Sequence, residues 1–405
     1  MTTLETDSGE LERWLTEHGE GLIALRRNIH AHPELSGEEY ATTELVAERL
    51  ALAGLEPRRL SAGTGLVCDI DPGDPRPAPR FALRADIDAL AMIDEKGAPY
   101  SSQHPGVAHA CGHDVHTAVV LGAGLFFAHH RDLLPGPIRL IFQPAEERVP
   151  GGALDVLADG GLEQVDAIVG LHCEPKLDVG TIGLKTGPIS SAADMAVISI
   201  SGPGGHTARP ELTVDLVTVA ARIVNELPMR VGARLASDGH RSTDVKVVFG
   251  AIHAGDAANV IPTHCSLKAS VRTPVLDVWE RLPDLIRLEI EALIADTDAT
   301  MTLDYTHGVP PVVNDPDVTE TVRRAALTTV GADSLATVDQ SWGGDDFAWF
   351  TREIPGTYAR LGVRDPAGPT LDLHAGLFDV DERAIGIGVR LLVESVRQHF
   401  APSDR

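Results

Sequence analysis

The stretch DVHTAVVLGAGLFFAHHRDLLPGPIRLIFQP, residues 114–144, contains the signals of a buried helix and of a buried strand. Its first part is a long apolar run that favours a buried helix, and IRLIFQ near its end is a short apolar run typical of a buried strand. Similar short runs occur before it, in TGLVCDI and RFALRADID, and after it, in VDAIVGLHCEP. Strands that alternate with helices in this way predict an α/β sheet that is covered by helices on both faces.

Two domains are expected in a chain of 405 residues, because a single hydrophobic core rarely extends over so long a chain. The pattern changes at about Gly187, after which DMAVISISGPGG alternates like a half-exposed strand. From there the segments predict the order β-α-β-β-α-β, a compact unit inserted into the larger fold. We therefore predict a first domain formed by residues 1–187 and 309–405, and an inserted domain formed by residues 188–308.

Charge and composition argue against several classes of partner. The chain has 34 Lys and Arg residues against 59 Asp and Glu residues, and its formal charge of -25 would repel nucleic-acid phosphates and anionic lipids. The segment MTTLETDSGELERWL lacks the pattern of a secretory signal, and the apolar run Ala118–Ala128 is too short to cross a bilayer. We expect a soluble cytoplasmic protein that binds neither nucleic acid nor membranes. Four cysteines in a chain of this size form no disulfide framework.

Residue types that bind metals gather where the predicted strands end. HACGHDVH places Cys111 and His113 two positions apart on a turn before a helix. Glu147, His172 and His374 lie near the ends of other strand-like segments, and ligands bind beyond the carboxyl ends of strands in open α/β sheets. Any one of these side chains is more often packed or solvated than a ligand. Together they make a metal site as plausible as the ordinary roles, and zinc is a suitable ion for it.

The adjacent glutamates of QPAEE raise a separate question. Successive residues on an extended chain point in opposite directions, so Glu146 and Glu147 cannot both be plain ligands of one ion. If one carboxylate binds metal, its neighbour can accept the proton of an attacking water and later pass it to a leaving amine. The alternative is an exposed turn, which is common on acidic proteins.

Other interpretations of these motifs are open at this point. Cys111 could be the nucleophile of a thiol enzyme with His113 as its base, or the site could hold a structural zinc in a non-catalytic binding protein. His30 and His32 in HAHPE lie on a predicted helix end, where a structural role is favoured. The sequence has no G-x-S-x-G, H-E-x-x-H, Walker or G-x-G-x-x-G motif, so serine-hydrolase, zincin and nucleotide-binding functions lose their usual support.

Nine motifs occur in an order that resembles one enzyme superfamily. They are HAHPELSGEE, RADIDAL, HACGHDVHT, FQPAEE, GLHCEP, GPGGHTARP, NVIP, GDDF and LHAGLFDVDE. This order is similar to that of the two-domain amidohydrolases of the aminoacylase and carboxypeptidase metallopeptidase superfamily. The branch is that of hippurate hydrolase, N-acyl-amino-acid amidohydrolases and indole-acetyl-amino-acid hydrolases. The resemblance implies a mixed-sheet, zinc-peptidase-like catalytic domain with an inserted lid domain.

The resemblance also implies a role for individual residues of a dinuclear centre. The implied ligands of two divalent metal ions are Cys111, His113, Glu147, His172 and His374. Glu146 would be the general base, and Asp88 would orient a ligand histidine. Asp345 and Asp346 stand where the family usually has Glu-Asp, so their role is less defined. This donor set would accept zinc, manganese, cobalt or nickel.

The inserted unit resembles the lid through which many family members dimerise, which implies a homodimer. His206 would reach the partner's active site and stabilise the oxyanion, while Asn259 and Arg272 would contact the substrate, since Arg is suited to a carboxylate. The segment before Arg272 reads ASVRT, where many members have Gly-Thr before the Arg. The implied reaction is hydrolysis of an N-acyl amino acid or a similar small amide. Hydrolysis of small peptides or of succinyl diamino acids is the alternative.

Overall fold

The computed structural model of the protein describes residues 3–74 and 79–402. The chain divides into two compact units, and each is described by itself. The first unit comprises Met1–Gly187, Val313–Asp339 and Asp346–Arg405, and the second comprises Pro188–Val312 and Gln340–Asp345. The second unit therefore includes the short segment Gln340–Asp345, which was predicted to belong to the first domain.

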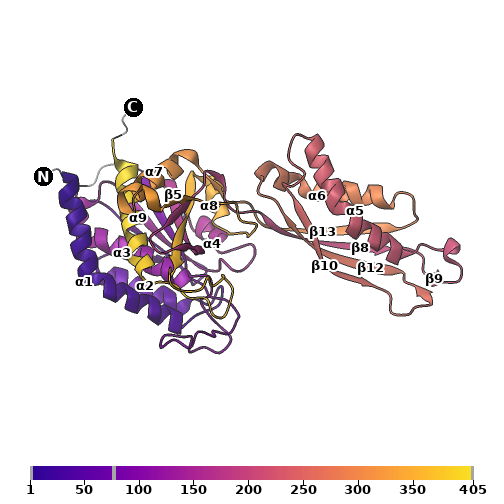
Figure 1. Ribbon diagram of the computed structural model, residues 1–405, viewed down its shortest axis with the longest axis horizontal. Coiled ribbons are helices and arrows are strands. Elements are labelled where there is room, and N and C mark those ends of the chain that lie inside the picture. Colours follow the sequence, from indigo (N-terminus) through magenta and orange to yellow (C-terminus); the bar gives the residue numbers. More distant parts are fainter. Residues whose placement is uncertain (1–2, 75–78, 403–405) are drawn as a thin grey trace. The chain divides into compact units, whose positions relative to one another are not determined.

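A mixed β-sheet forms the centre of the first unit (Figure 1). Its strand order is β1 (Arg58–Arg59), β2 (Leu66–Ile70), β4 (Ile138–Gln143), β3 (Arg80–Asp86), β5 (Val165–Asp178), β16 (Gly356–Arg364), β6 (Ile182–Leu184) and β15 (Leu335–Thr337). The central strands β4, β3, β5 and β16 are parallel, whereas β2 is antiparallel to β4 and β6 is antiparallel to β16. The predicted α/β fold with a mixed sheet is confirmed.

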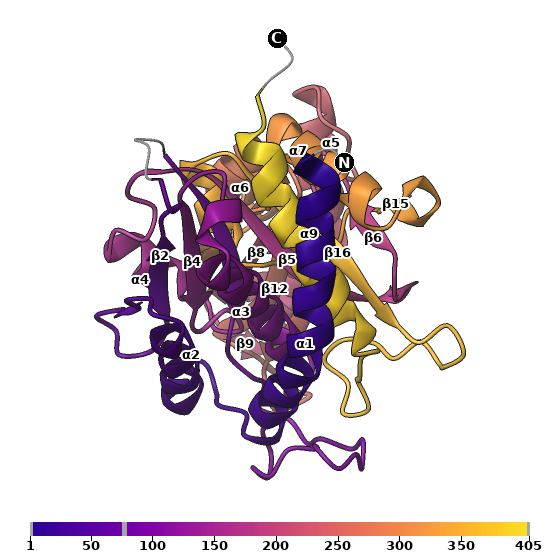
Figure 2. The same cartoon turned by 90° about the vertical axis from the view of Figure 1, so that its left-hand side faces the viewer.

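Helices cover both faces of this sheet. Figure 2 shows α1 (Thr3–Ala31), α3 (His113–His129) and α9 (Arg383–Phe400) over one face, near α2 (Tyr40–Leu52), and α7 (Pro316–Thr329) packs against α9. The short helices α4 (Ala153–Ala158) and α8 (Ala348–Glu353) pack against each other on the opposite face. Within the described part of the chain, no helix combines the length and the apolar character needed to cross a bilayer.

Helix α3 and strand β4 form as the opening stretch predicts, and two glycines allow α3 to pack deeply. A Cβ atom on Gly124 would lie 2.3 Å from Leu140 Cδ1 of β4, and one on Gly122 would lie 2.8 Å from both Leu22 Cδ1 and Val389 Cγ2. These distances are shorter than any van der Waals contact. A side chain at either position would force these neighbours to move, so the two glycines allow the helix to lie close to the sheet and to helices α1 and α9.

The second unit is a layer of antiparallel strands with helices on one face. Its sheet has the order β10 (Lys246–Ala254), β12 (His264–Arg272), β8 (Ala193–Ser201) and β13 (Thr300–Val309). Alternate residues of β8 and β12 are buried against α5 (Leu216–Ser237) and α6 (Leu276–Ile294), which contact each other. Along the chain these elements follow the order β-α-β-β-α-β. A short pair, β9 (Gly205–His206) with β11 (Val260–Ile261), is added to it.

Candidate metal centre

The tight turn at the start of α3 places Cys111 and His113 on either side of Gly112. Gly112 has a φ of 90°, a conformation that glycine adopts without steric cost. A Cβ atom there would lie 2.6 Å from Cys173 Sγ on the neighbouring strand β5. The glycine therefore allows the turn to approach β5, and this brings Cys111 close to His172 on that strand. Cys111 Sγ lies 3.5 Å from His172 Nε2.

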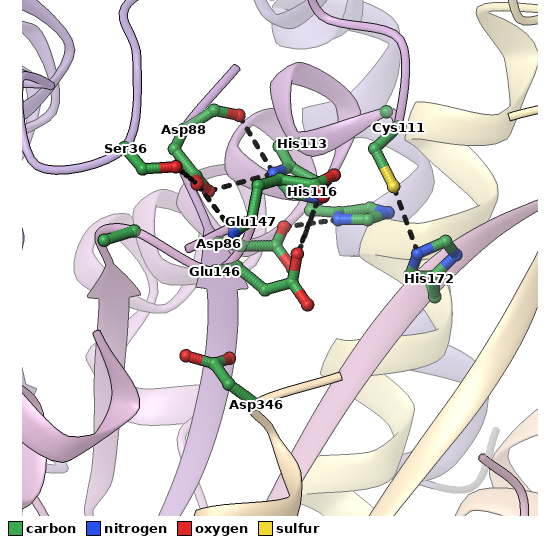
Figure 3. Close-up of polar contacts among 12 residues, drawn as sticks. Ser36, Asp86, Asp88, Cys111, His113, His116, Glu146, Glu147, His172 and Asp346 are labelled. Carbon is green, nitrogen blue, oxygen red and sulfur yellow. Dashed lines mark hydrogen bonds and ion pairs between the residues drawn. The ribbon is translucent and has the colours of Figure 1, made fainter. Parts of the chain in front are cut away.

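His113 is hydrogen-bonded to Asp88, the residue expected to orient a ligand histidine. Its Nδ1 lies 2.9 Å from the carbonyl oxygen of Asp88 and 3.2 Å from Asp88 Oδ1, so the proton on Nδ1 is donated to these acceptors. The other ring nitrogen, Nε2, is buried without a hydrogen-bond partner. It lies 3.8 Å from Glu146 Oε2 and 3.9 Å from Glu147 Oε1 (Figure 3). An imidazole held in this way directs Nε2 to the centre of the cluster, where a metal ion could take the place of the Nε2 proton.

The predicted ligands lie together in the first unit. Cys111, His113 and Glu147 each offer one ligand atom, and these atoms lie within 4.8 Å of one another. Figure 3 shows His172 beside Cys111 at the edge of this group. His374 Nε2 lies 3.1 Å from Glu147 Oε1, although that oxygen makes no hydrogen bond of acceptable geometry. The His374 side chain is 54% exposed, so it forms the solvent side of the cluster.

The electrostatics of the cluster favour a cation. Burial alone would lower the pKa of His113, but the carboxylates of Asp86 and Asp88 outweigh it and raise that pKa to about 10. Burial, followed by the charges of Glu147 and Glu146, raises the pKa of the Cys111 thiol well above its ordinary value. Negative charge is therefore in excess in this buried site. A divalent cation would neutralise it and would stabilise the thiolate.

His172 offers a neutral ring nitrogen to the same cluster. Burial, together with the charges of Arg360 and His116, lowers the pKa of His172 well below its ordinary value. Its Nδ1 lies 2.7 Å from the carbonyl oxygen of Cys173, so this nitrogen donates the proton and Nε2 keeps its lone pair. A buried thiol, a carboxylate, the neutral imidazole of His172 and the imidazole of His113, which a bound cation would keep deprotonated, are the donor set that zinc and similar divalent ions prefer. The residues present fit a metal centre.

One premise about the two glutamates was wrong. Glu146 and Glu147 lie in a turn after β4, not on an extended segment, because the preceding residue Ala145 has a left-handed φ of 54°. Both carboxylates consequently approach the same nitrogen, His113 Nε2, instead of pointing to opposite sides. A second expectation also needs correction, since His172 does not end its strand. β5 continues to Asp178 and pairs with β16 at His172.

Supporting residues that were not among the predicted site residues lie beneath the cluster. Asp86, at the end of β3, accepts a hydrogen bond from His116 Nδ1 at 2.6 Å. His116 Nε2 accepts the main-chain N–H of Cys173 at 2.9 Å, so both ring nitrogens of His116 are engaged. His116 therefore fixes β5 against α3 and has no lone pair to offer an ion. The motif RADID was the signal that could have identified Asp86. Asp86 stands two positions before the predicted Asp88, and residues two apart on an extended segment share a face.

Asp346 and His30 are both held in buried networks. Asp346 Oδ1 accepts from Arg84 Nη2 at 3.0 Å, and its Oδ2 accepts from the main-chain N–H of Ala153 at 3.0 Å. His30, in the last turn of α1, has its Nδ1 2.7 Å from Asp114 Oδ2, which agrees with the structural role expected for this histidine.

The structure also bears on the thiol-enzyme alternative. The raised pKa of Cys111 is unfavourable for the nucleophilic thiolate that such an enzyme needs.

The remaining predicted site residues belong to the second unit. His206 is exposed on β9 and pairs with Val260 of β11. The carbonyl oxygen of Asn259 accepts the main-chain N–H of Thr207 at 3.3 Å, which ties NVIP to GGHT. Arg272, at the end of β12, donates from Nη1 to the carbonyl oxygen of Trp342 at 2.7 Å.

Comparisons with a family model, with known proteins and with solved structures each identify peptidases or deacetylases as similar to this chain. The model of a family described as peptidase family M20/M25/M40 matches residues 82–398. An N-acetyl-L-cysteine deacetylase from Bacillus subtilis strain 168 is 37% identical over 390 residues, which cover 93% of this chain and 88% of that protein. A crystal structure of a dinuclear metal-binding peptidase of the M20 family from Bacillus subtilis superimposes with a TM-score of 0.83 at 31% identity, covering 97% of this chain and 99% of that one.

A further relative is much longer than this chain. A protein from Rhodococcus jostii strain RHA1, provisionally named glutamate–cysteine ligase 2-3, is 43% identical over 392 residues. The match covers 97% of this chain and 48% of the relative, so the chain spans about half the length of that protein.

Proposed function

The chain belongs to peptidase family M20/M25/M40, as the sequence motifs predicted, and from this premise we propose that it is a metal-dependent amidohydrolase of N-acyl amino acids or similarly small amides. The products would be a carboxylic acid and an amino acid or amine. The observation that carries the proposal is the buried, unpartnered Nε2 of His113, which faces a thiol and two carboxylates. Such a group is costly to bury unless a ligand satisfies it.

The proposed ligands of two divalent ions are Cys111, His113, Glu147, His172 and His374. When bound, such ions supply Lewis acidity that makes water more acidic and polarises the amide carbonyl. Asp88 fixes the tautomer of His113 through the bond to Nδ1, so that Nε2 stays available. The number and identity of the ions are part of the proposal.

Glu146 is the proposed general base. Its carboxylate lies at the same ring nitrogen as that of Glu147, with Oε2 3.8 Å from His113 Nε2. A carboxylate in this position can accept a proton from the attacking water and then donate it to the departing amine. A closed structural zinc site would need four ligands and no additional carboxylate. The presence of Glu146 beside the ligand set therefore favours catalysis over a non-catalytic metal-binding role.

The second unit supplies further groups in this proposal. His206 would donate a hydrogen bond to the oxyanion that forms from the amide carbonyl, in the partner's active site of a homodimer. Asn259 and Arg272 would contact the substrate, and the guanidinium of Arg272 suits the carboxylate of an N-acyl amino acid. These roles rest on the matched motifs. The name of the 37% identical Bacillus subtilis relative, an N-acetyl-L-cysteine deacetylase, supports a substrate of this class.

A substrate panel tests the proposal. Metal-free protein would be reloaded separately with zinc, manganese, cobalt and nickel, and each form assayed for release of amine from acetyl, benzoyl, indole-acetyl and succinyl amino acids. We expect cleavage of at least one acyl class by at least one metal form. Dipeptides and succinyl diamino acids belong in the same panel, because faster cleavage of these would replace the proposed substrate by the alternative one. A panel without any cleavage would refute the proposal.

A further inference from the structure

We propose that Glu39 is a positioning residue, which holds the turn that carries Glu146 and Glu147. This inference rests on the proposed function, because it concerns the geometry of the proposed general base. Glu39 is fully buried, and its Oε1 accepts the main-chain N–H of Ala145 at 2.8 Å and that of Gly37 at 2.7 Å. Residues 37 and 145 are thereby joined through a single carboxylate oxygen.

The bond to Ala145 acts where the turn needs support. Ala145 has a φ of 54°, and a residue with a Cβ atom rarely adopts this left-handed conformation unless its surroundings hold it there. The carbonyl oxygen of Ala145 also accepts the N–H of Gly152 at 3.0 Å. This conformation turns the chain away from the direction of β4 and directs both glutamates toward His113. Without the hydrogen bond that Ala145 donates to Glu39, a return of Ala145 to an ordinary backbone conformation would relieve the steric cost of its left-handed φ.

A second carboxylate anchors the other side of Glu146. Asp88 Oδ2 accepts the main-chain N–H of Glu147 at 2.9 Å and the hydroxyl of Ser36 at 2.7 Å (Figure 3). The backbone is thus fixed at positions 145 and 147, immediately before and after the proposed base. The loop that supplies Ser36 and Glu39 follows α1 directly, so residues far away in the sequence determine where Glu146 lies.

A purely local role for Glu39 does not account for these contacts. Glu39 stands at the N-cap position of α2, but its side chain makes no capping hydrogen bond to that helix. Glu34 does this instead, since its carboxylate oxygens accept the N–H groups of Ala41 and Thr42 at 2.9 and 2.8 Å. The Glu39 side chain is directed to the turn at Ala145. Glu34 is therefore a matched control, a carboxylate of the same loop that binds backbone amides elsewhere.

The variants Glu39→Ala, Glu39→Gln and Glu34→Ala separate positioning from stability. We expect Glu39→Ala to lower kcat roughly 10- to 100-fold with KM changed less than about threefold, because a small displacement of a catalytic group is costly. Glu39→Gln should stay within about threefold of the parent, because its amide oxygen can accept the same two bonds. Glu34→Ala should lower the Tm but keep kcat. Equal kcat in Glu39→Ala and the parent, or an equal loss in Glu34→Ala, would overturn the proposal.

Two further measurements test the role of Glu39, and the second of them needs no catalytic activity. Ala145→Gly should restore most of the kcat of Glu39→Ala, because glycine adopts a φ of 54° without support. A double variant as slow as Glu39→Ala would contradict this. Hydrogen exchange at the Ala145 amide should be slow in the parent and faster in Glu39→Ala, and unchanged exchange would refute the inference. If the parent cleaves no amide, the proposed function fails, and the exchange result still decides the role of Glu39.

Discussion

At the scale of single residues, the arrangement of Glu146 and Glu147 shows how two adjacent like charges can serve one site. Both carboxylates approach His113 Nε2, at 3.8 and 3.9 Å, because Ala145 turns the chain after β4. The sequence predicted which side chains would gather here. It could not predict the turn, because a left-handed alanine is held by contacts with residues far away in the chain.

The division of roles between the two glutamates predicts different defects in two isosteric variants. Glu146→Gln should bind metal like the parent but lose roughly 10²- to 10⁴-fold in kcat, since an amide cannot accept the proton of water. Glu147→Gln should lose metal, because the carboxylate ligand becomes a neutral amide. Metal content by elemental analysis and initial rates check both. A Glu146→Gln variant with normal kcat would exclude Glu146 as the base.

At the scale of elements, a buried ion pair joins the two helices that support the site. Arg26 of α1 donates from Nε to Asp114 Oδ2 of α3 at 2.6 Å, and both side chains are 1% exposed. The sequence predicted α3 from its apolar run, and it predicted a helix end at HAHPE, where α1 ends. It gave no sign of this pair, because the partners are 88 residues apart and a charge on an amphipathic helix is usually solvated. The continuation of β5 past Pro175 was missed because proline normally marks a strand end.

The ion pair predicts how stability depends on pH. Burial alone would raise the pKa of Asp114, but the charges of Arg26 and His30 outweigh it and hold that pKa well below its ordinary value. The charged form therefore stabilises the fold at pH values above about 4, the unfolded value, and this contribution is lost as the pH falls below it. Denaturant unfolding between pH 7 and pH 3 should show a declining midpoint.

Replacing the buried carboxylate tests the same pair. Asp114→Asn should lower the free energy of unfolding at pH 7, by at most about 3–5 kcal/mol, because the buried Arg26 loses its nearest carboxylate and keeps those of Asp379 and Glu382. It should also flatten the decline of stability toward acid. Glu44→Gln, in the exposed pair with Arg59, is the control and should leave both nearly unchanged. An Asp114→Asn variant as stable as the parent would show that the pair contributes nothing.

At the scale of the whole molecule, the sequence predicted the α/β class with a mixed sheet and the family, because hydrophobic periodicity and ordered motifs are local signals. The strand order could not be predicted in this way. β16 lies next to β5 in the middle of the sheet, although almost 200 residues separate them in the chain, and only tertiary packing determines that position. The return of Gln340–Asp345 to the second unit was missed for the same reason.

The proposed homodimer concerns the exposed edge of the second unit. β10 is an outer strand of its sheet and carries exposed apolar side chains, with Val248 60% and Ile252 50% exposed. An edge of this kind pairs readily with another chain. Light scattering should therefore give twice the monomer mass of 43.0 kDa. Val248→Lys with Ile252→Lys should reduce the mass to that of a monomer, whereas Leu52→Lys, at an exposed apolar residue of α2, should not. A parent protein of monomer mass would refute the dimer.

Removal and return of the metal test whether the hydrolysis depends on a divalent ion. The protein would be dialysed exhaustively against a chelator, and its metal content and its hydrolysis of the best N-acyl amino acid from the panel would be measured together. We expect activity to fall in proportion to metal content and to return when a divalent metal is added back, as for a Lewis-acid reaction. Full activity in protein shown to contain no metal would contradict this expectation.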